Sequence, residues 1–168
     1  MSDANRHDID ALNSLIETTL DSADGYEEAA KETDVAAYRD RFVKRAGERR
    51  RVAADLQTAV RGLGATPEDD GSILAKAHRA FLDVKHALLR DEQAVVNSVE
   101  NGEDFIKGKF ERALEDDKVS ATTREVIRRA YLTIKDGHDE MRDLKHALEG
   151  ADGRPVTTTT PDGRPLSM

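Results

Sequence analysis

The side chains in this sequence that could bind a metal ion are its acidic residues and its five histidines, because it contains no cysteine. Carboxylates and imidazoles that converge from several helices bind iron, manganese or zinc. A Glu three residues before a His places two such ligands on one helical face. None of the five histidines has a Glu at that position, so the sequence lacks this ligand motif. The lack of cysteine also rules out disulfides, thiolate metal sites and cysteine nucleophiles.

The pattern Asp-x-x-His occurs twice, in DVKHAL from Asp83 and in DLKHAL from Asp143. This spacing would allow the two copies to share one zinc ion. The alternative is that Val, Leu and Ala of both copies pack inward while the polar residues face solvent. The sequence has no glycine-rich phosphate loop and no nucleophile elbow, so we predict no catalytic residues.

One charged residue interrupts an apolar helical seam. Alternating steps of three and four from Phe42 give Ala46, Arg49, Ala53, Leu56, Val60 and Leu63. A buried guanidinium needs an acidic partner, which in turn remains ionised beside it. The alternative is that helix rotation lets the long Arg49 side chain reach solvent.

Apolar residues recur with helical spacing in four long segments, which predicts an all-α protein. The first helix is expected from Ile9, after a disordered segment at 1–8, with Asp8 or Asp10 as its cap. The others are expected at about 35–63, at 91–115 and from Ser120 onward. One bundle domain would then cover residues 9–149.

The lengths of the connections predict which helices of the bundle run parallel and which run antiparallel. The first two helices are joined by a short turn, as are the last two, so each pair should be antiparallel. Residues 64–90 are long enough to cross the bundle and include a short helix expected after Ser72. The prediction is an up-down four-helix bundle with one long crossover that contains an extra helix. Residues 150–168 repeat Asp-Gly-Arg-Pro around a threonine run and are expected to be disordered, as a solubilising extension or a docking peptide.

The charge of the chain limits its partners. The net charge is −8 and the isoelectric point is near 5.2, which argues against nucleic acid. No segment is apolar enough to cross a membrane, and the N-terminus has no secretory signal, so we expect a cytoplasmic protein.

Acids predominate in the first helix and Arg and Lys in the second. These two helices either complement each other along their flanks or expose an anion-binding patch.

Four segments, in this order, resemble a known family: LNSLIETTLDSADGYEEAA, LGATPEDDGSILAKAHRAFLDVKHAL, VENGEDFIKGKFERAL and TIKDGHDEMRDL. They resemble the bacterial family catalogued as domain of unknown function 2383, a group of ferritin-like four-helix-bundle proteins. The resemblance covers about residues 9–148. It implies a ferritin-like fold and a bacterial cytoplasmic protein, and it implies no established activity.

Ferritin-like di-iron proteins carry one Glu on each of two helices and a Glu-x-x-His on each of the other two. The positions at matching height here are Thr19 on the first helix and Arg49 and Val52 on the second. The third helix keeps Glu103, and His138 lies one turn from the corresponding position on the fourth. An intact di-iron centre is therefore not predicted.

We expect instead a charged core network in which Arg49 replaces the charge of the metals and pairs with Glu103. The alternative is a rebuilt site for iron, manganese or zinc around Glu103 and His138. The nearby carboxylates that could serve it are Glu17, Asp21, Glu48 and Glu100. His138 also has a purely structural interpretation, as a side chain held by one hydrogen bond across the bundle.

These patterns predict a protein without cofactor or enzymatic activity that acts through association, with itself or with another protein. The alternative is a metal-binding protein or oxidase that uses iron or manganese at the rebuilt site. A third interpretation is an adaptor that is recognised through its C-terminal tail.

Overall fold

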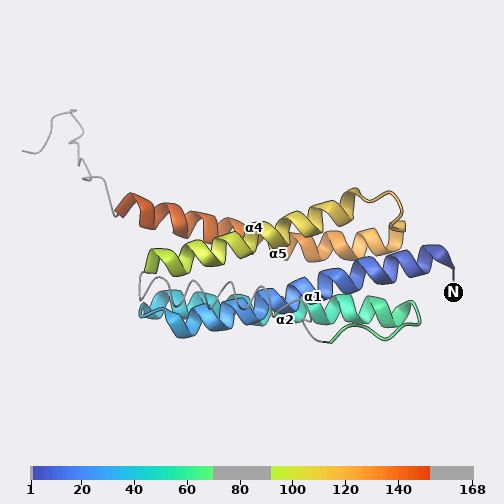
Figure 1. Cartoon of the computed structure of the whole chain (residues 1–168), viewed down its shortest axis with the longest axis horizontal. Helices are drawn as coiled ribbons and strands as arrows, with labels where there is room; N and C mark the ends of the chain where they lie inside the picture. The colour runs from blue at the N-terminus through green and yellow to red at the C-terminus, as the bar shows by residue number, and fades with distance from the viewer. Residues whose placement is uncertain (1, 70–91, 152–168) are drawn as a thin grey trace, which may run out of the picture.

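The computed structural model describes residues 2–69 and 92–151, which form a four-helix bundle (Figure 1). The helices are α1 (Asp3–Glu32), α2 (Ala36–Gly62), α4 (Glu92–Glu115) and α5 (Ala121–Ala151). The prediction of an all-α four-helix bundle is confirmed. The expected crossover helix, the DVKHAL segment and the C-terminal tail lie outside the described residues.

Each helix packs against two neighbours. Helix α1 contacts α2 and α4, and α5 contacts α4 and α2, so α2 and α4 lie diagonally across the bundle. Figure 1 shows that α1 and α5 run in one direction while α2 and α4 run in the other. The expected parallel orientation of the second and third long helices is therefore present.

Helix α1 begins six residues earlier than the apolar pattern indicates, and the expected start at Ile9 after a disordered segment at 1–8 is wrong. Ser2 caps the helix, because its hydroxyl accepts a hydrogen bond from the Asn5 amide at 3.2 Å. The first turns carry polar side chains, so apolar periodicity could not detect them. Asp8 does not cap α1 but points at another helix.

Asp8 is buried and joins α1 to the start of α5. Its carboxylate accepts hydrogen bonds from the Ser120 amide at 2.9 Å and from the Thr123 hydroxyl at 2.9 Å. Ser120 is the capping residue of α5, because its hydroxyl accepts from the Thr123 amide at 3.3 Å. The opposite end of the bundle is fixed by Glu92, which accepts hydrogen bonds from the Thr33 hydroxyl at 2.6 Å and the Asp34 amide at 2.8 Å.

The apolar core consists of two clusters, one toward each end of the bundle. The first cluster contains Ile9, Leu12, Leu15, Ile16, Val52, Leu56, Val60, Ile106, Phe110, Val119, Ile127, Ala130 and Ile134. The second contains Tyr26, Ala29, Ala30, Phe42, Ala46, Val96, Val99, Met141 and Leu144. On α2 the seam predicted from the sequence supplies Phe42, Ala46, Leu56 and Val60 to these clusters. Between the clusters the core is polar.

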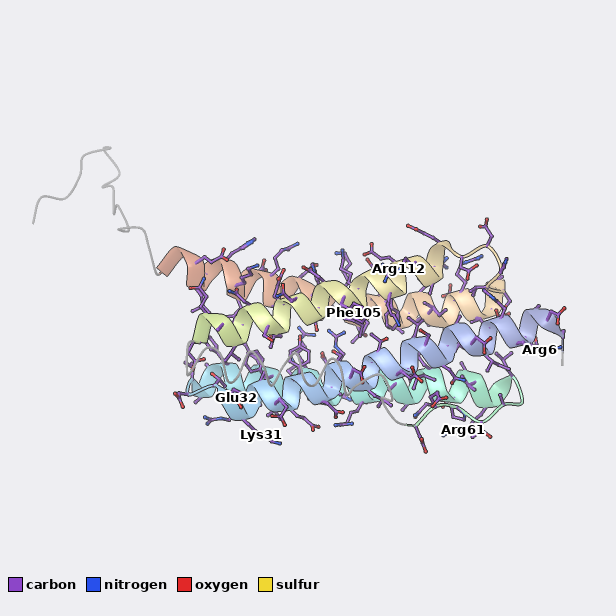
Figure 2. All side chains as sticks on the ribbon, in the orientation of Figure 1. Arg6, Lys31, Glu32, Arg61, Phe105 and Arg112 are labelled. Carbon is purple, nitrogen blue, oxygen red and sulfur yellow. The ribbon has the colours of Figure 1, made fainter. Side chains whose placement is uncertain are left out.

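Charged side chains cover the outside of the bundle (Figure 2). Arg50 on α2 reaches α1, where it donates hydrogen bonds to Glu27 at 2.7 Å and Asp24 at 2.9 Å. The acidic first helix and the basic second helix thus complement each other at this contact, as one of the two interpretations predicted. In the two described ranges, no helix has an apolar stretch long enough to cross a membrane.

Candidate functional site

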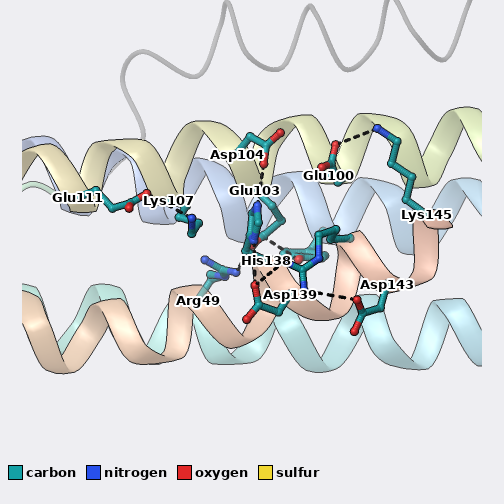
Figure 3. Close-up of polar contacts among 12 residues, drawn as sticks. Arg49, Glu100, Glu103, Asp104, Lys107, Glu111, His138, Asp139, Asp143 and Lys145 are labelled. Carbon is teal, nitrogen blue, oxygen red and sulfur yellow. Dashed lines mark hydrogen bonds and ion pairs between the residues drawn. The ribbon is translucent and has the colours of Figure 1, made fainter.

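Arg49 and Glu103 meet at the centre of the bundle. The side chain of each is only 1% exposed, and Arg49 Nη2 donates to both Glu103 carboxylate oxygens, at 2.8 and 2.7 Å. Because α2 and α4 are diagonal neighbours, this ion pair crosses the bundle axis (Figure 3). The pair lies between the two apolar clusters, since Ala46 and Val52 flank Arg49 along α2.

The other two helices complete this layer. Tyr26 on α1 donates its hydroxyl to Glu103 Oε1 at 2.7 Å, and its ring lies 5.7 Å from the Arg49 guanidinium carbon. Burial and the neighbouring Glu103 carboxylate raise the pKa of Tyr26 well above its ordinary value, so the phenol keeps its proton. Gly137 on α5 provides the space, because a Cβ built there would overlap Arg49 Nη2. We call Tyr26, Arg49, Glu103 and Gly137 the ionic layer.

The structure decides between the two interpretations of Arg49, because its side chain does not reach solvent. The contact with Glu103 differs from a two-nitrogen fork, since one nitrogen, Nη2, makes both hydrogen bonds. Arg49 Nε and Nη1 are buried and have no hydrogen-bond partner among the described residues. The guanidinium is thus held by one carboxylate, by the face of Tyr26 and by close packing.

Three potential metal ligands gather beside the ionic layer, on α4 and α5. Glu100, Asp104 and His138 each offer one ligand atom, and these atoms all lie within 4.8 Å of one another. Glu100 and His138 are buried, whereas Asp104 is exposed. Figure 3 shows the imidazole of His138 next to Asp104, at the helix position that follows Gly137.

Two further residues orient this group. His138 Nε2 lies 2.7 Å from Asp104 Oδ1, and its other nitrogen, Nδ1, lies 3.2 Å from Asp139 Oδ1. The hydrogen bond with His138 and a second one from Lys135 lower the pKa of Asp139, which therefore stays ionised beside the imidazole. Lys145 donates to Glu100 Oε2 at 3.4 Å. The group is thus already held by hydrogen bonds in the protein.

The ligand set expected from the sequence does not assemble. Glu103 is held by Arg49 and Tyr26, and Glu48 accepts a hydrogen bond from Arg45 at 2.7 Å. Glu17 and Asp21 on α1 belong to no group of three potential ligands within residues 2–69 and 92–151. Of the six residues named as possible metal ligands from the sequence, Glu100 and His138 are part of the observed group.

Sequence reasoning missed Asp104, Gly137 and the hydroxyl of Tyr26. Asp104 follows Glu100 by four positions, so the two carboxylates share a helical face, and this spacing could have identified it. Gly137 lies in the seam next to His138, and a seam glycine at the height of a buried arginine indicates space for a large side chain. The contact between Tyr26 and Glu103 has no local sequence signal, because it joins residues 77 positions apart.

An open groove runs along the outer surface between α2 and α5, with a volume of about 680 Å³. Its apolar lining includes Tyr38 and Leu144. Arg41 borders the groove from α2, and Asp136 and Asp143 border it from α5. One side of the groove is therefore basic and the other acidic.

Comparisons with known proteins agree with this architecture. A mutant of Mycobacterium smegmatis Dps1 is similar in structure, with a TM-score of 0.74 over 86% of this chain and 99% of the other. The two sequences are 12% identical, so the similarity shows the fold alone. No curated protein matches the chain. The family model described as "Domain of unknown function (DUF2383)" matches residues 7–116, about two thirds of the sequence, and the chain therefore belongs to this family.

Proposed function

We propose that this protein is a non-enzymatic ferritin-like bundle that acts by associating with protein, and that its partner is a second copy of the same chain. The observation that carries the proposal is the ionic layer. Arg49 and Glu103 fill the bundle axis with a fixed cation and its carboxylate. A bundle whose centre is occupied by its own side chains acts through its outer surface.

The positive charge of Arg49 at the centre of the bundle opposes the binding of two iron ions there. Two divalent cations need several converging carboxylates, whereas here one carboxylate is already neutralised by Arg49. Introducing metal ions next to a buried guanidinium would add like charges in a region of low dielectric constant. The alternative function, an oxidase built around Glu103 and His138, is therefore less well supported, since hydrogen bonds direct these two side chains to different partners.

The groove between α2 and α5 supports the second copy as partner. It combines apolar lining with a charged rim, as protein interfaces do. A two-fold axis along the groove would place α2 of each copy over α5 of the other, so that Arg41 faces Asp143 of the second molecule. The same patch would then be complementary to itself.

A charge exchange across the groove tests this proposal by sedimentation equilibrium. We expect Arg41→Glu and Asp143→Arg each to weaken dimerisation at least tenfold, about 1.4 kcal/mol. Mixing the two variants should restore association, because both contacts of the mixed dimer then join opposite charges: Glu with Arg at one, and Arg41 with Asp143 at the other. Arg61→Glu, an exposed change on α2 outside the groove, is the control and should leave dimerisation unchanged. A wild-type chain that stays monomeric at millimolar concentration would refute this partner.

The absence of oxidase activity is tested separately with ferrous iron. We expect the protein to oxidise added Fe²⁺ in air no faster than buffer does, because no di-iron centre can form around Arg49. Absorbance of the ferric product over time measures the rate. Catalysed oxidation that Glu103→Gln abolishes would contradict the proposal.

A further inference from the structure

We propose that Glu100, Asp104 and His138 bind one divalent transition-metal ion on the face formed by α4 and α5. This site lies outside the ionic layer and adds a metal-binding property to the proposed association. It uses none of the positions that a di-iron centre would occupy on the bundle axis.

The distances require little rearrangement. The three ligand atoms lie within 4.8 Å of one another, while two atoms that bind the same ion lie at most about 4.4 Å apart, twice a typical bond length. Glu100 and Asp104 project from the same side of α4, because they are four residues apart. His138 reaches them from α5. A side-chain rotation of Glu100 or Asp104 is enough to bring all three ligands onto one ion.

The orientation of His138 is that of a metal ligand. Metal-binding histidines commonly donate their second ring N–H to a carboxylate, which fixes the ring and its tautomer. Here Nδ1 is paired with Asp139 at 3.2 Å, and Nε2 points to Asp104 at 2.7 Å. A metal ion would take the place of the proton that Nε2 shares with Asp104.

Burial and charge distinguish this group from an ordinary acidic surface patch. Glu100 and His138 are each 8% exposed, so they are already largely desolvated. Asp104 has a side chain that is 57% exposed, which gives the ion a path from solvent. Among the described residues, Lys145 is the cation paired with the two ligand carboxylates, through a long 3.4 Å contact with Glu100, whereas Lys135 and Arg142 pair with Asp139. The site therefore attracts a cation.

The donor set also selects the class of ion. One imidazole with two carboxylates suits zinc, iron and manganese, whereas magnesium and calcium prefer oxygen ligands alone. Sites of this kind bind manganese less tightly than iron, and iron less tightly than zinc. We expect the order Zn²⁺, Fe²⁺, Mn²⁺, with Mg²⁺ much weaker. Three protein ligands leave a position for water on the exposed side.

The test is isothermal titration of the metal-free full chain with ZnCl₂ and, separately, with MgCl₂. His138→Gln, Asp104→Asn and Glu100→Gln each remove one ligand with little change in shape. We expect each to lower zinc affinity by more than the 10- to about 100-fold that loss of a supporting residue costs. Asp139→Asn should fall within that range, since Asp139 acts only through His138.

Two further variants make the result specific. His7→Gln is the matched control, because His7 also lies 2.7 Å from an aspartate, Asp116, yet belongs to no three-ligand group in the described part of the chain. It should bind zinc as the wild type does. Lys145→Gln should raise zinc affinity about 2- to 5-fold, because it removes an ion that competes for Glu100.

The zinc titrations either support the proposed site or overturn it. Zinc binding that depends on all three ligands but not on His7 supports the site. Zinc binding that survives in all three ligand variants places the metal elsewhere and overturns the proposal, as does a wild-type chain that binds no zinc. Circular dichroism of each variant confirms that the bundle is still folded when affinity is lost. None of these results depends on whether the chain dimerises.

Discussion

Arg49 is the residue on which the centre of the bundle depends. Removing its charge from water is unfavourable, and the attraction to Glu103 offsets this cost without adding much net stability. Breaking the pair is different, because it leaves one buried charge without its counterion. Arg49 therefore matters as the counterion of Glu103. The free energy of unfolding falls when only one member of the pair is removed.

The first prediction concerns Arg49→Met, which keeps the volume and removes the charge. We expect the free energy of unfolding, measured with urea, to fall by about 3–5 kcal/mol, because Glu103 loses its counterion. The double variant with Glu103→Leu should recover much of this loss, since no charge is then left alone. Arg50→Met, which breaks the exposed contact with Asp24 and Glu27, should cost less than about 1 kcal/mol. A loss from Arg49→Met as small as that of Arg50→Met would show that Glu103 does not depend on Arg49.

The second prediction concerns Gly137, where helix propensity and packing oppose each other. In an open helical position, replacing Gly by Ala stabilises by up to about 1 kcal/mol. At Gly137 the new methyl group would overlap Arg49 Nη2, which Glu103 holds in place, so we expect Gly137→Ala to destabilise the protein. Gly102→Ala on α4 is the control, because nothing lies within 4 Å of its Cβ position, and it should be stabilising. Thermal unfolding of both variants measures the difference; if both raise the melting temperature, the space at Gly137 is not needed.

At the scale of the helix, the junction between α1 and α5 depends on ionised Asp8. Burial acts to raise the pKa of Asp8, but the hydrogen bonds from Ser120 and Thr123 outweigh it, and the pKa lies below its ordinary value of 3.8. A carboxyl group whose pKa is lower in the folded state stabilises the fold above its unfolded pKa. This contribution is lost as the pH falls through the folded pKa.

The third prediction follows from the lowered pKa of Asp8 in the folded protein. Asp8→Ala should lower the free energy of unfolding at pH 7 by about 1–3 kcal/mol, because it leaves the Ser120 amide and the Thr123 hydroxyl without their acceptor. The difference between variant and wild type should shrink below about pH 4, where Asp8 of the unfolded wild-type chain begins to bind a proton while Asp8 of the folded chain is still ionised. Urea unfolding from pH 3 to pH 7 measures it, with the exposed Asp10→Ala as control. A difference that is the same at all pH values would show that the charge of Asp8 does not stabilise the junction.

At the scale of the whole molecule, the sequence predicts the helices and their arrangement better than it predicts the site. The apolar seams are long and regular, so the core residues and the parallel orientation of α2 and α4 followed from spacing and connection length. The start of α1 did not, because residues 3–8 carry no apolar repeat. Helix boundaries depend on caps such as Ser2, which leave a weak signal.

The candidate site was predictable only in part, for a geometric reason. Arg49 and Glu103 stood out because each is a charged residue in an apolar seam. His138 stood out too, with Glu100 among the carboxylates near it, but Asp104 did not, because it lies just outside the seam on an exposed face. Contacts between the flanks of two helices depend on how far each helix is rotated about its own axis. Residue spacing in the sequence does not determine this rotation to within a fraction of a turn.

The ionic layer also has a consequence for the alignment of the four helices. Each helix contributes one member, and the apolar seams on either side are built from similar residues that would tolerate sliding. Displacing any one helix by a turn, about 5.4 Å, would separate the guanidinium from its carboxylate or move the phenol or the glycine away from it. Every such shifted alignment is therefore less stable than the native one. The ionic layer alone thus fixes the register of all four helices.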